Sequence, residues 1–127
     1  MNINGSYSQR RREAVVRSLP TVAMAAADSY VGAALAFDSF GYGGAGAPGA
    51  LEFASGGLAA VHGIRAARKL YVAYNETDKL EQRRAQTQAI GHLAVTAGFI
   101  CLASGMGATA LPLLAIGEAT NLYATLS

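Results

Sequence analysis

Helical spacing dominates the pattern of apolar and polar positions along the chain. Good helix formers fill residues 9–18, and largely apolar, Ala-rich stretches follow at 21–37, 51–74, 80–104 and 109–126. No run of β-branched residues alternates with polar ones, so the sequence offers no candidate strands. The pattern predicts an all-α fold: a helical hairpin at about 51–74 and 80–104, with an N-terminal helix before it and a C-terminal helix after it.

Polar and glycine-rich segments mark the ends of these predicted helices. Residues 1–8 are polar and are expected to form a flexible tail, while residues 41–49 hold five Gly and one Pro, which favours a linker. The turn of the hairpin is predicted at 75–78, where Thr77 and Asp78 suit helix capping. Pro20 is expected to interrupt or restart the N-terminal helix. Residues 9–127 therefore form one predicted domain.

Small residues form a stripe on each arm of the predicted hairpin, with spacings of four, three and four in the first arm and of seven in the second. These candidate helix-packing residues are Gly56, Ala60, Gly63 and Ala67, and Gly91, Gly98 and Gly105. If the hairpin folds about residue 77, Gly63 faces Gly91 and Gly56 faces Gly98. Because a glycine inside a helix costs roughly 1 kcal/mol relative to Ala, two aligned stripes suggest a close approach of the two backbones. The alternative is a chance spacing in a chain rich in small residues.

Composition restricts the class of protein. The 127 residues include 27 Ala and 15 Gly, about a third of the chain, with one Cys and a net charge of +2. A mean hydropathy of +0.26 is too apolar for a disordered polyelectrolyte. A single Cys excludes a disulfide framework and every zinc pattern built on several cysteines. Among the remaining classes, the composition fits an ordered helical protein with a core of small side chains.

The ten cations fall into two clusters. The basic N-terminal segment holds Arg10, Arg11, Arg12 and Arg17, and the basic tip of the hairpin holds Arg65, Arg68, Lys69, Lys79, Arg83 and Arg84. Residues 85–127 carry one charge, that of Glu118, and residues 18–64 carry three acids. Since a solvated surface normally mixes charges of both signs, these two stretches are expected to face lipid or protein.

Candidate chemistry is sparse. His62 and His92 are opposite each other in the hairpin register, but each lies about 100° from its glycine stripe, and we expect their rings on opposite sides of the hairpin. We therefore predict no metal site, no cofactor and no catalytic residue. Asp28, Glu52 and Glu118 are isolated acids that either pair with the basic tip of a neighbouring subunit or lie exposed.

The order of apolar helix, short basic loop and apolar helix over residues 47–117 resembles the general plan of conjugative-pilus subunits and of small membrane-inserting secreted bacterial proteins. The resemblance is one of architecture and rests on no diagnostic motif. No residue takes a role from it.

Two classes of function fit these features. The first is a non-enzymatic protein that associates with or inserts into a membrane, its basic clusters meeting anionic lipid and its small-residue helices packing closely. The alternative is a soluble structural subunit of a large helical assembly, which packs its Ala/Gly faces against other subunits. Both imply self-association, and both place the protein at a membrane or in an assembly. Nucleic-acid binding through the N-terminal arginines is less favoured, and no cleaved signal peptide is expected.

Overall fold

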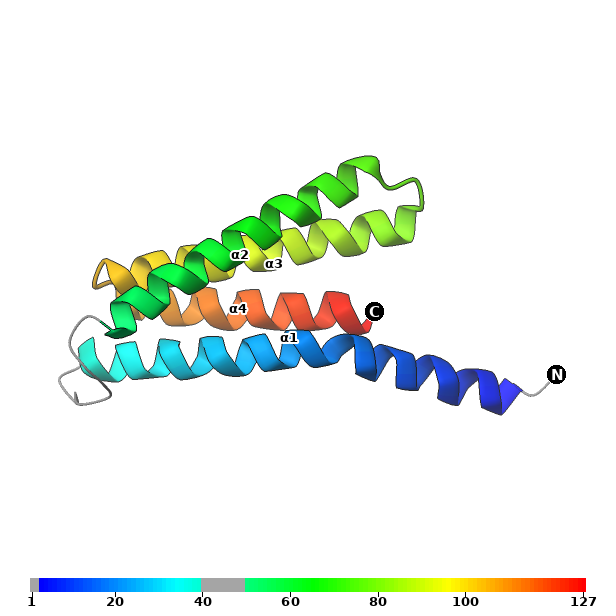
Figure 1. Ribbon diagram of the computed structural model, residues 1–127, viewed down its shortest axis with the longest axis horizontal. Coiled ribbons are helices and arrows are strands. Elements are labelled where there is room, and N and C mark those ends of the chain that lie inside the picture. The colour runs from blue at the N-terminus through cyan, green and yellow to red at the C-terminus, as the bar shows by residue number, and fades with distance from the viewer. Residues whose placement is uncertain (1–2, 40–49) are drawn as a thin grey trace.

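The chain is a bundle of long helices. The computed structural model describes the backbone of residues 3–39 and 50–127, with side chains for 6–35 and 53–127. These ranges form four helices and no strands: α1 (Ile3–Ser39), α2 (Ala50–Asn75), α3 (Lys79–Ala103) and α4 (Gly107–Leu126), shown in Figure 1. The all-α prediction is confirmed, and both arms of the hairpin begin and end within one residue of their predicted bounds. The predicted linker at 41–49 lies outside the described residues.

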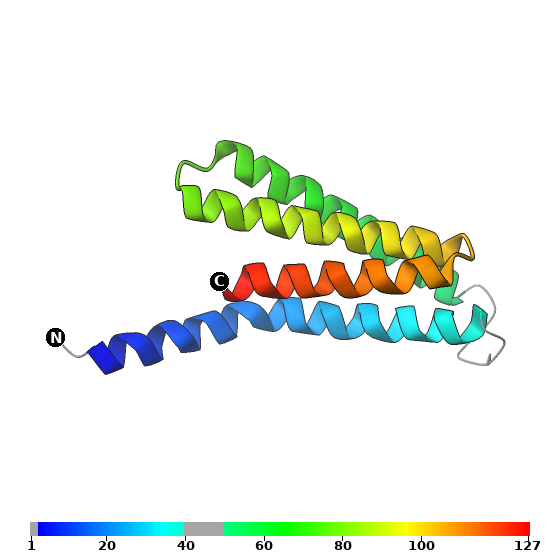
Figure 2. The same cartoon turned by 180° about the vertical axis from the view of Figure 1, so that it is seen from behind.

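Helix α1 is longer than the sequence predicts. It begins at Ile3, so residues 3–8 of the expected tail are helical, and the Arg10 side chain donates to the Ser6 carbonyl oxygen across one turn. Pro20 lies inside the helix, where it removes one backbone donor without ending the helix. The N-terminal part of α1 projects beyond the other helices in both views (Figures 1 and 2).

Helix α3 lies between α2 and α4, while α1 packs chiefly on α4. Toward the turn of the α2–α3 hairpin, α2 diverges from α1, so the bundle is open at that end (Figures 1 and 2). At the other end an apolar core closes the bundle, formed by Leu35, Val95, Phe99, Leu102, Ala110 and Leu114. The bundle therefore has an apolar end and an open end. Within the described ranges, no helix is long and apolar enough to cross a membrane.

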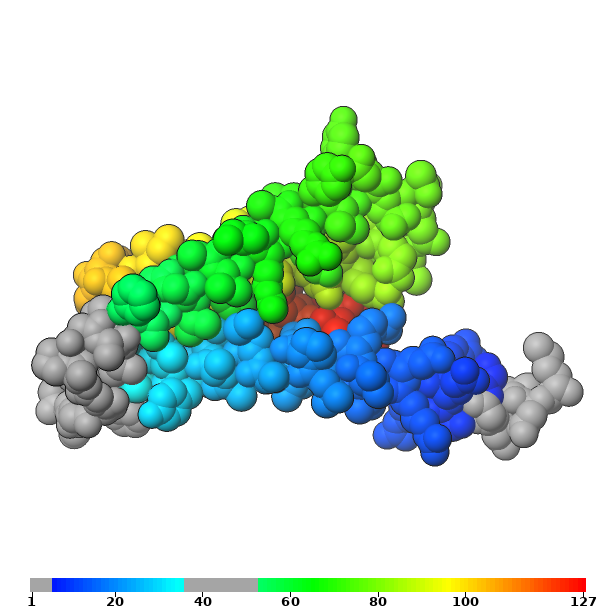
Figure 3. Space-filling model, in the orientation of Figure 1, coloured from blue at the N-terminus to red at the C-terminus, as the bar shows by residue number. Residues whose placement is uncertain are grey.

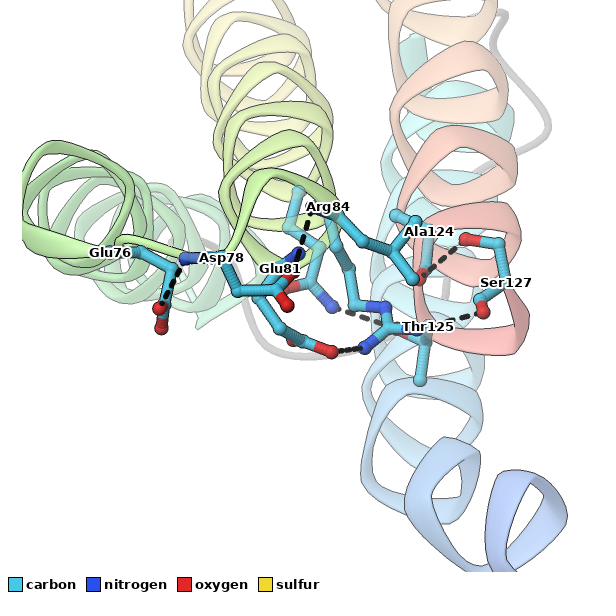
Figure 4. Close-up of polar contacts among 9 residues, drawn as sticks. Glu76, Asp78, Glu81, Arg84, Ala124, Thr125 and Ser127 are labelled. Atoms are coloured by element: carbon cyan, nitrogen blue, oxygen red, sulfur yellow. Dashed lines mark hydrogen bonds and ion pairs between the residues drawn. The ribbon is translucent and has the colours of Figure 1, made fainter. Parts of the chain in front are cut away.

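Side-chain hydrogen bonds hold the ends of α3 and α4. Asp78 caps α3, as predicted, by accepting from the backbone N–H groups of Leu80 and Glu81 at 2.8 and 3.0 Å. Arg84 ties the start of α3 to the end of α4, since it pairs with Glu81 and donates to the Ser127 carbonyl oxygen at 2.8 Å (Figure 4).

Glycines allow α3 and α4 to approach closely. A Cβ on Gly91 would lie 2.9 Å from the Gly117 carbonyl oxygen, and a Cβ on Gly117 would lie 2.8 Å from the Gly91 carbonyl oxygen. A Cβ on Gly98 would lie 2.8 Å from the Leu114 side chain. Gly91 and Gly98 therefore pack against a neighbouring helix, as their stripe suggested, but that helix is α4 rather than α2.

The predicted pairing of the two small-residue stripes across the α2–α3 hairpin is wrong. Nothing lies within 4 Å of a Cβ built on Gly56 or Gly63, and Ala60 and Ala67 are exposed. Gly105 lies in the turn after α3 with a φ of +77°, a left-handed conformation that favours glycine and ends the helix. The stripe of α2 therefore faces outward.

The predicted register of α2 against α3 is correct. The face of α2 that turns inward differs from the predicted one by a single residue position. Ser55 Oγ donates to the Phe99 carbonyl oxygen at 3.1 Å, a pairing that agrees with a turn about residue 77. The inward face of α2 holds Ser55, Ala59, His62 and Ala66, which repeat the spacing of the predicted stripe one position earlier. Its two polar residues, Ser55 and His62, are both buried and hydrogen-bonded.

Candidate functional site

All four helices contribute to one buried polar cluster. Asp28 of α1 lies 2.8 Å, Oδ2 to Nε2, from His62 of α2, and His62 Nδ1 lies 2.8 Å from Nδ1 of His92 on α3. From α4, the Asn121 side-chain nitrogen is 3.4 Å from the same His92 atom, and Glu118 adjoins Asp28. Asp28 and His62 are each 1% exposed. The cluster therefore joins residues 28 to 121 through side chains that are buried, apart from the half-buried Glu118.

The two carboxyl groups of the cluster compete for donors. With both ionised, Asp28 Oδ1 and Glu118 Oε1 are buried without a hydrogen-bond partner among the described residues. Burial, together with a side-chain hydrogen bond to Asp28 and the charge of that carboxylate, raises the pKa of Glu118 to about 9. In the protein alone, Glu118 is therefore protonated at neutral pH and acts as a donor toward Asp28.

The histidine pair shares a single hydrogen. Only one hydrogen can lie between the two Nδ1 atoms, so one imidazole donates and the other accepts. Burial lowers the pKa of His92 to about 4, and the adjacent His62 and the positive charge of Arg65 add to the effect. His92 is therefore neutral near pH 7.

The lowered pKa of His92 makes a component of stability dependent on pH. Between about pH 6.5 and 4 the unfolded chain binds a proton at His92 that the folded protein does not bind, so acidification removes stability in this window. Glu118 acts in the opposite direction, since its raised pKa favours the folded state more as the pH falls toward 4.5. We therefore expect His92→Gln to lose less stability than the wild type between pH 6.5 and 4. Urea unfolding at several pH values measures this difference, and parallel curves would contradict the assignment.

A basic cavity of about 480 Å³ opens beside the cluster. It is lined by residues of all four helices, and Figure 3 shows the hollow between α1 and α2 with α4 at its floor. Five cations line it, Arg17, Arg65, Arg68, Lys69 and Arg84, against three acids, Glu76, Glu81 and Glu118. Nothing in the linear pattern of residues pointed to this cavity.

Most of the cations that line the cavity are unpaired. Of the five, only Arg84 forms an ion pair within the described part of the chain, with Glu81. Burial lowers the pKa of Lys69, and the guanidinium groups of Arg68 and Arg65 lower it further. Crowded positive charge of this kind offers several donors to an anion.

The structure divides both predicted basic clusters. Arg65, Arg68, Lys69 and Arg84 of the basic tip line the cavity, whereas Lys79 and Arg83 are exposed and do not. Arg17 of the N-terminal segment joins the cavity, and its remaining cations, Arg10, Arg11 and Arg12, lie exposed on the projecting part of α1. The basic tip is thus partly an internal lining rather than an outward patch.

The expectation that the two histidine rings lie on opposite sides of the hairpin is wrong. The rings are adjacent, with centroids 5.1 Å apart, because α2 is rotated so that His62 rather than Gly63 faces α3. Asp28 and Glu118 meet each other inside one chain and are not exposed, while the side chain of Glu52 lies outside the described residues. The acids in apolar stretches and the matched histidines were the signals from which the cluster could have been found.

Comparison with known proteins adds no assignment. No family model, no curated protein and no solved structure matches the chain. The function therefore has to be argued from the described residues themselves.

Proposed function

We propose that the protein is a structural, non-enzymatic helical subunit that self-associates, packing apolar outer faces against further copies of the same chain. The observation that carries the proposal is the outward face of α2. A face without charge is unusual on a helix that meets water.

The outer face of α2 consists of Phe53, Gly56, Ala60, Ile64, Ala67, Tyr71 and Tyr74, which recur at helical spacing. Its four large side chains are strongly exposed, Phe53 to 85%, Ile64 to 70%, Tyr71 to 71% and Tyr74 to 88%. No charged residue interrupts it. Contiguous exposed apolar surface marks interaction sites in proteins, and the small residues between the large ones allow a partner helix to come close. A second copy of this face has the same small and large residues with which to interlock.

Association with an anionic membrane surface is the second candidate. The unpaired cations of the basic cavity favour it, as does the projecting part of α1, where Arg10, Arg11 and Arg12 lie near the exposed Val15 and Val16. A helix that carries cations next to exposed apolar side chains suits binding at the surface of an anionic membrane, with its axis parallel to that surface. This candidate uses surfaces other than the outer face of α2, so one experiment separates the two.

Sedimentation of the full chain without detergent tests the proposal. We expect a defined oligomer well above the 13.0 kDa of one chain. Ile64→Glu places a charge on the outer face of α2 and is expected to shift the protein to monomer with an unchanged circular dichroism spectrum, because Ile64 is 70% exposed. Gln86→Glu adds the same charge at an exposed position of α3 and serves as the control.

A wild-type protein that remains monomeric would overturn self-association. If that monomer floats with vesicles containing anionic lipid but not with neutral vesicles, the membrane candidate replaces it. An Ile64→Glu oligomer as large as the wild type would show that the outer face of α2 is not the contact.

A further inference from the structure

The chemistry of the buried polar cluster suits a metal ion, whether or not the protein self-associates. One donor atom from each of Asp28, His62 and Glu118 lies within 4.8 Å of the other two. The residues come from α1, α2 and α4, so three separate helices converge on one point. Zinc binds imidazole nitrogen and carboxylate oxygen at about 2.0 to 2.2 Å, which places its ligand atoms roughly 3 to 3.5 Å apart in a tetrahedral site. Small side-chain adjustments bring the three atoms to these separations.

A second observation points to a ligand at this place. Asp28 is 1% exposed, yet its Oδ1 atom has no hydrogen-bond partner among the described residues, and the same holds for Glu118 Oε1. Among the side chains that the structure describes, no lysine or arginine pairs with either carboxyl group. Buried carboxylates are normally neutralised by a paired cation, a proton or a metal ion. In the metal-free protein the proton on Glu118 fills this role, and a metal ion that replaced it would find an oxygen atom of each acid within reach.

A cation can also reach the cluster without crossing the basic cavity. A second cavity of about 230 Å³ is lined by Asp28 and Glu118 together with small and apolar residues of α1 and α4, and no basic residue lines it. His62 and Glu118 also line the first cavity, together with its five cations. The approach through the second cavity is thus free of positive charge.

We propose that Asp28, His62 and Glu118 bind one divalent transition-metal ion of the zinc type inside the bundle. One imidazole nitrogen and two carboxylate oxygens form a mixed donor set that suits such an ion better than Mg²⁺ or Ca²⁺, which prefer oxygen ligands alone. His92 then hydrogen-bonds to His62 Nδ1 and orients the imidazole ring, as residues that contact a metal ligand commonly do. The ion would join α1 to the α2–α3 hairpin and to α4.

Direct loading of the tag-free full chain with Zn²⁺ and Co²⁺, after treatment with a chelator, tests the proposal. We expect one Zn²⁺ per chain by calorimetry and elemental analysis, a visible d–d absorption band with Co²⁺, and no displacement by excess Mg²⁺. Glu118→Gln and Asp28→Asn keep the shape of each side chain and are each expected to weaken Zn²⁺ binding by at least about tenfold, the lower end of what loss of an outer-shell partner costs. Glu76→Gln, an acid of the basic cavity outside the cluster, is the matched control and should bind as the wild type does.

Three outcomes would overturn the proposal. They are the absence of both Zn²⁺ uptake and the Co²⁺ band, equal binding of Mg²⁺, and an equal loss of affinity in Glu76→Gln, which would indicate surface binding. If Asp28→Asn fails to fold by circular dichroism, the Co²⁺ spectrum of the wild type and the Glu118→Gln variant decide the question without it.

Discussion

Gly117→Ala is expected to lower the free energy of unfolding by about 1–3 kcal/mol, the usual cost of overpacking a core. The added methyl group would lie 2.8 Å from the Gly91 carbonyl oxygen and 2.9 Å from the Val95 backbone nitrogen. Backbone atoms of a packed helix cannot turn aside as a side chain can, so α3 and α4 must separate. Gly91→Ala should have a similar effect, since its Cβ would lie 2.9 Å from the Gly117 carbonyl oxygen. Urea unfolding of both variants measures the loss.

Gly57→Ala is the matched control for these two substitutions. Gly57 lies inside α2 and has nothing within 4 Å of a Cβ, and it lies beside the outer face of α2 rather than on it. There the methyl group meets no neighbour and gains helix propensity, so stability should rise by up to roughly 1 kcal/mol. Equal effects of Gly117→Ala and Gly57→Ala would refute the close contact of α3 with α4.

His62→Leu is expected to cost about 1–3 kcal/mol at neutral pH, because it leaves a buried polar group without its hydrogen-bond partner. The variant would remove the hydrogen bond from His62 to Asp28 Oδ2 and the one between His62 and His92. Asp28 and His92 are both buried, so water does not readily replace these contacts. Leucine fills a similar volume, so the loss reports the polar contacts rather than a cavity. Thermal or urea unfolding of the metal-free protein provides the measurement.

Two further variants decide how that loss is interpreted. Glu81→Gln breaks the pair with Arg84, where Glu81 is 50% exposed, and should change stability by no more than about 1 kcal/mol. The double variant Asp28→Leu/His62→Leu also removes the carboxylate that His62→Leu leaves unpaired. It should recover part of the lost stability, because replacing both partners by apolar groups is often nearly neutral. If His62→Leu proves as stable as the wild type, the buried network does not hold the bundle together.

The α2–α3 hairpin shows how far sequence reasoning reached. Its register follows from the short turn and the Asp78 cap, both local features, and the structure agrees with it. Its rotation does not follow, because stripes that start at Ser55 and at Gly56 have the same spacing and are both rich in small residues. Periodicity identifies a helix and cannot choose between two neighbouring faces of it.

The candidate site was hidden by the same ambiguity. His62 and His92 were recognised as opposite each other, but the wrong rotation of α2 separated their rings. Asp28 and Glu118 were recognised as unusual acids in apolar stretches, but nothing local indicated that they meet. Their contact requires α1 and α4 to lie against each other, which depends on packing between segments some 90 residues apart.

For α2, α3 and α4 the sequence by itself determined where the helices form, where they end and how the hairpin aligns, because capping, glycine breaks and helical spacing act within a few residues. For α1 it did not, since the helix begins earlier than the pattern indicated and continues through Pro20. The tertiary structure alone decided which face of each helix is buried. It placed α3 between two helices, so that its glycines meet α4 while His92 meets α2. Burial is a property of all four helices together, and the polar cluster exists only where their inward faces converge.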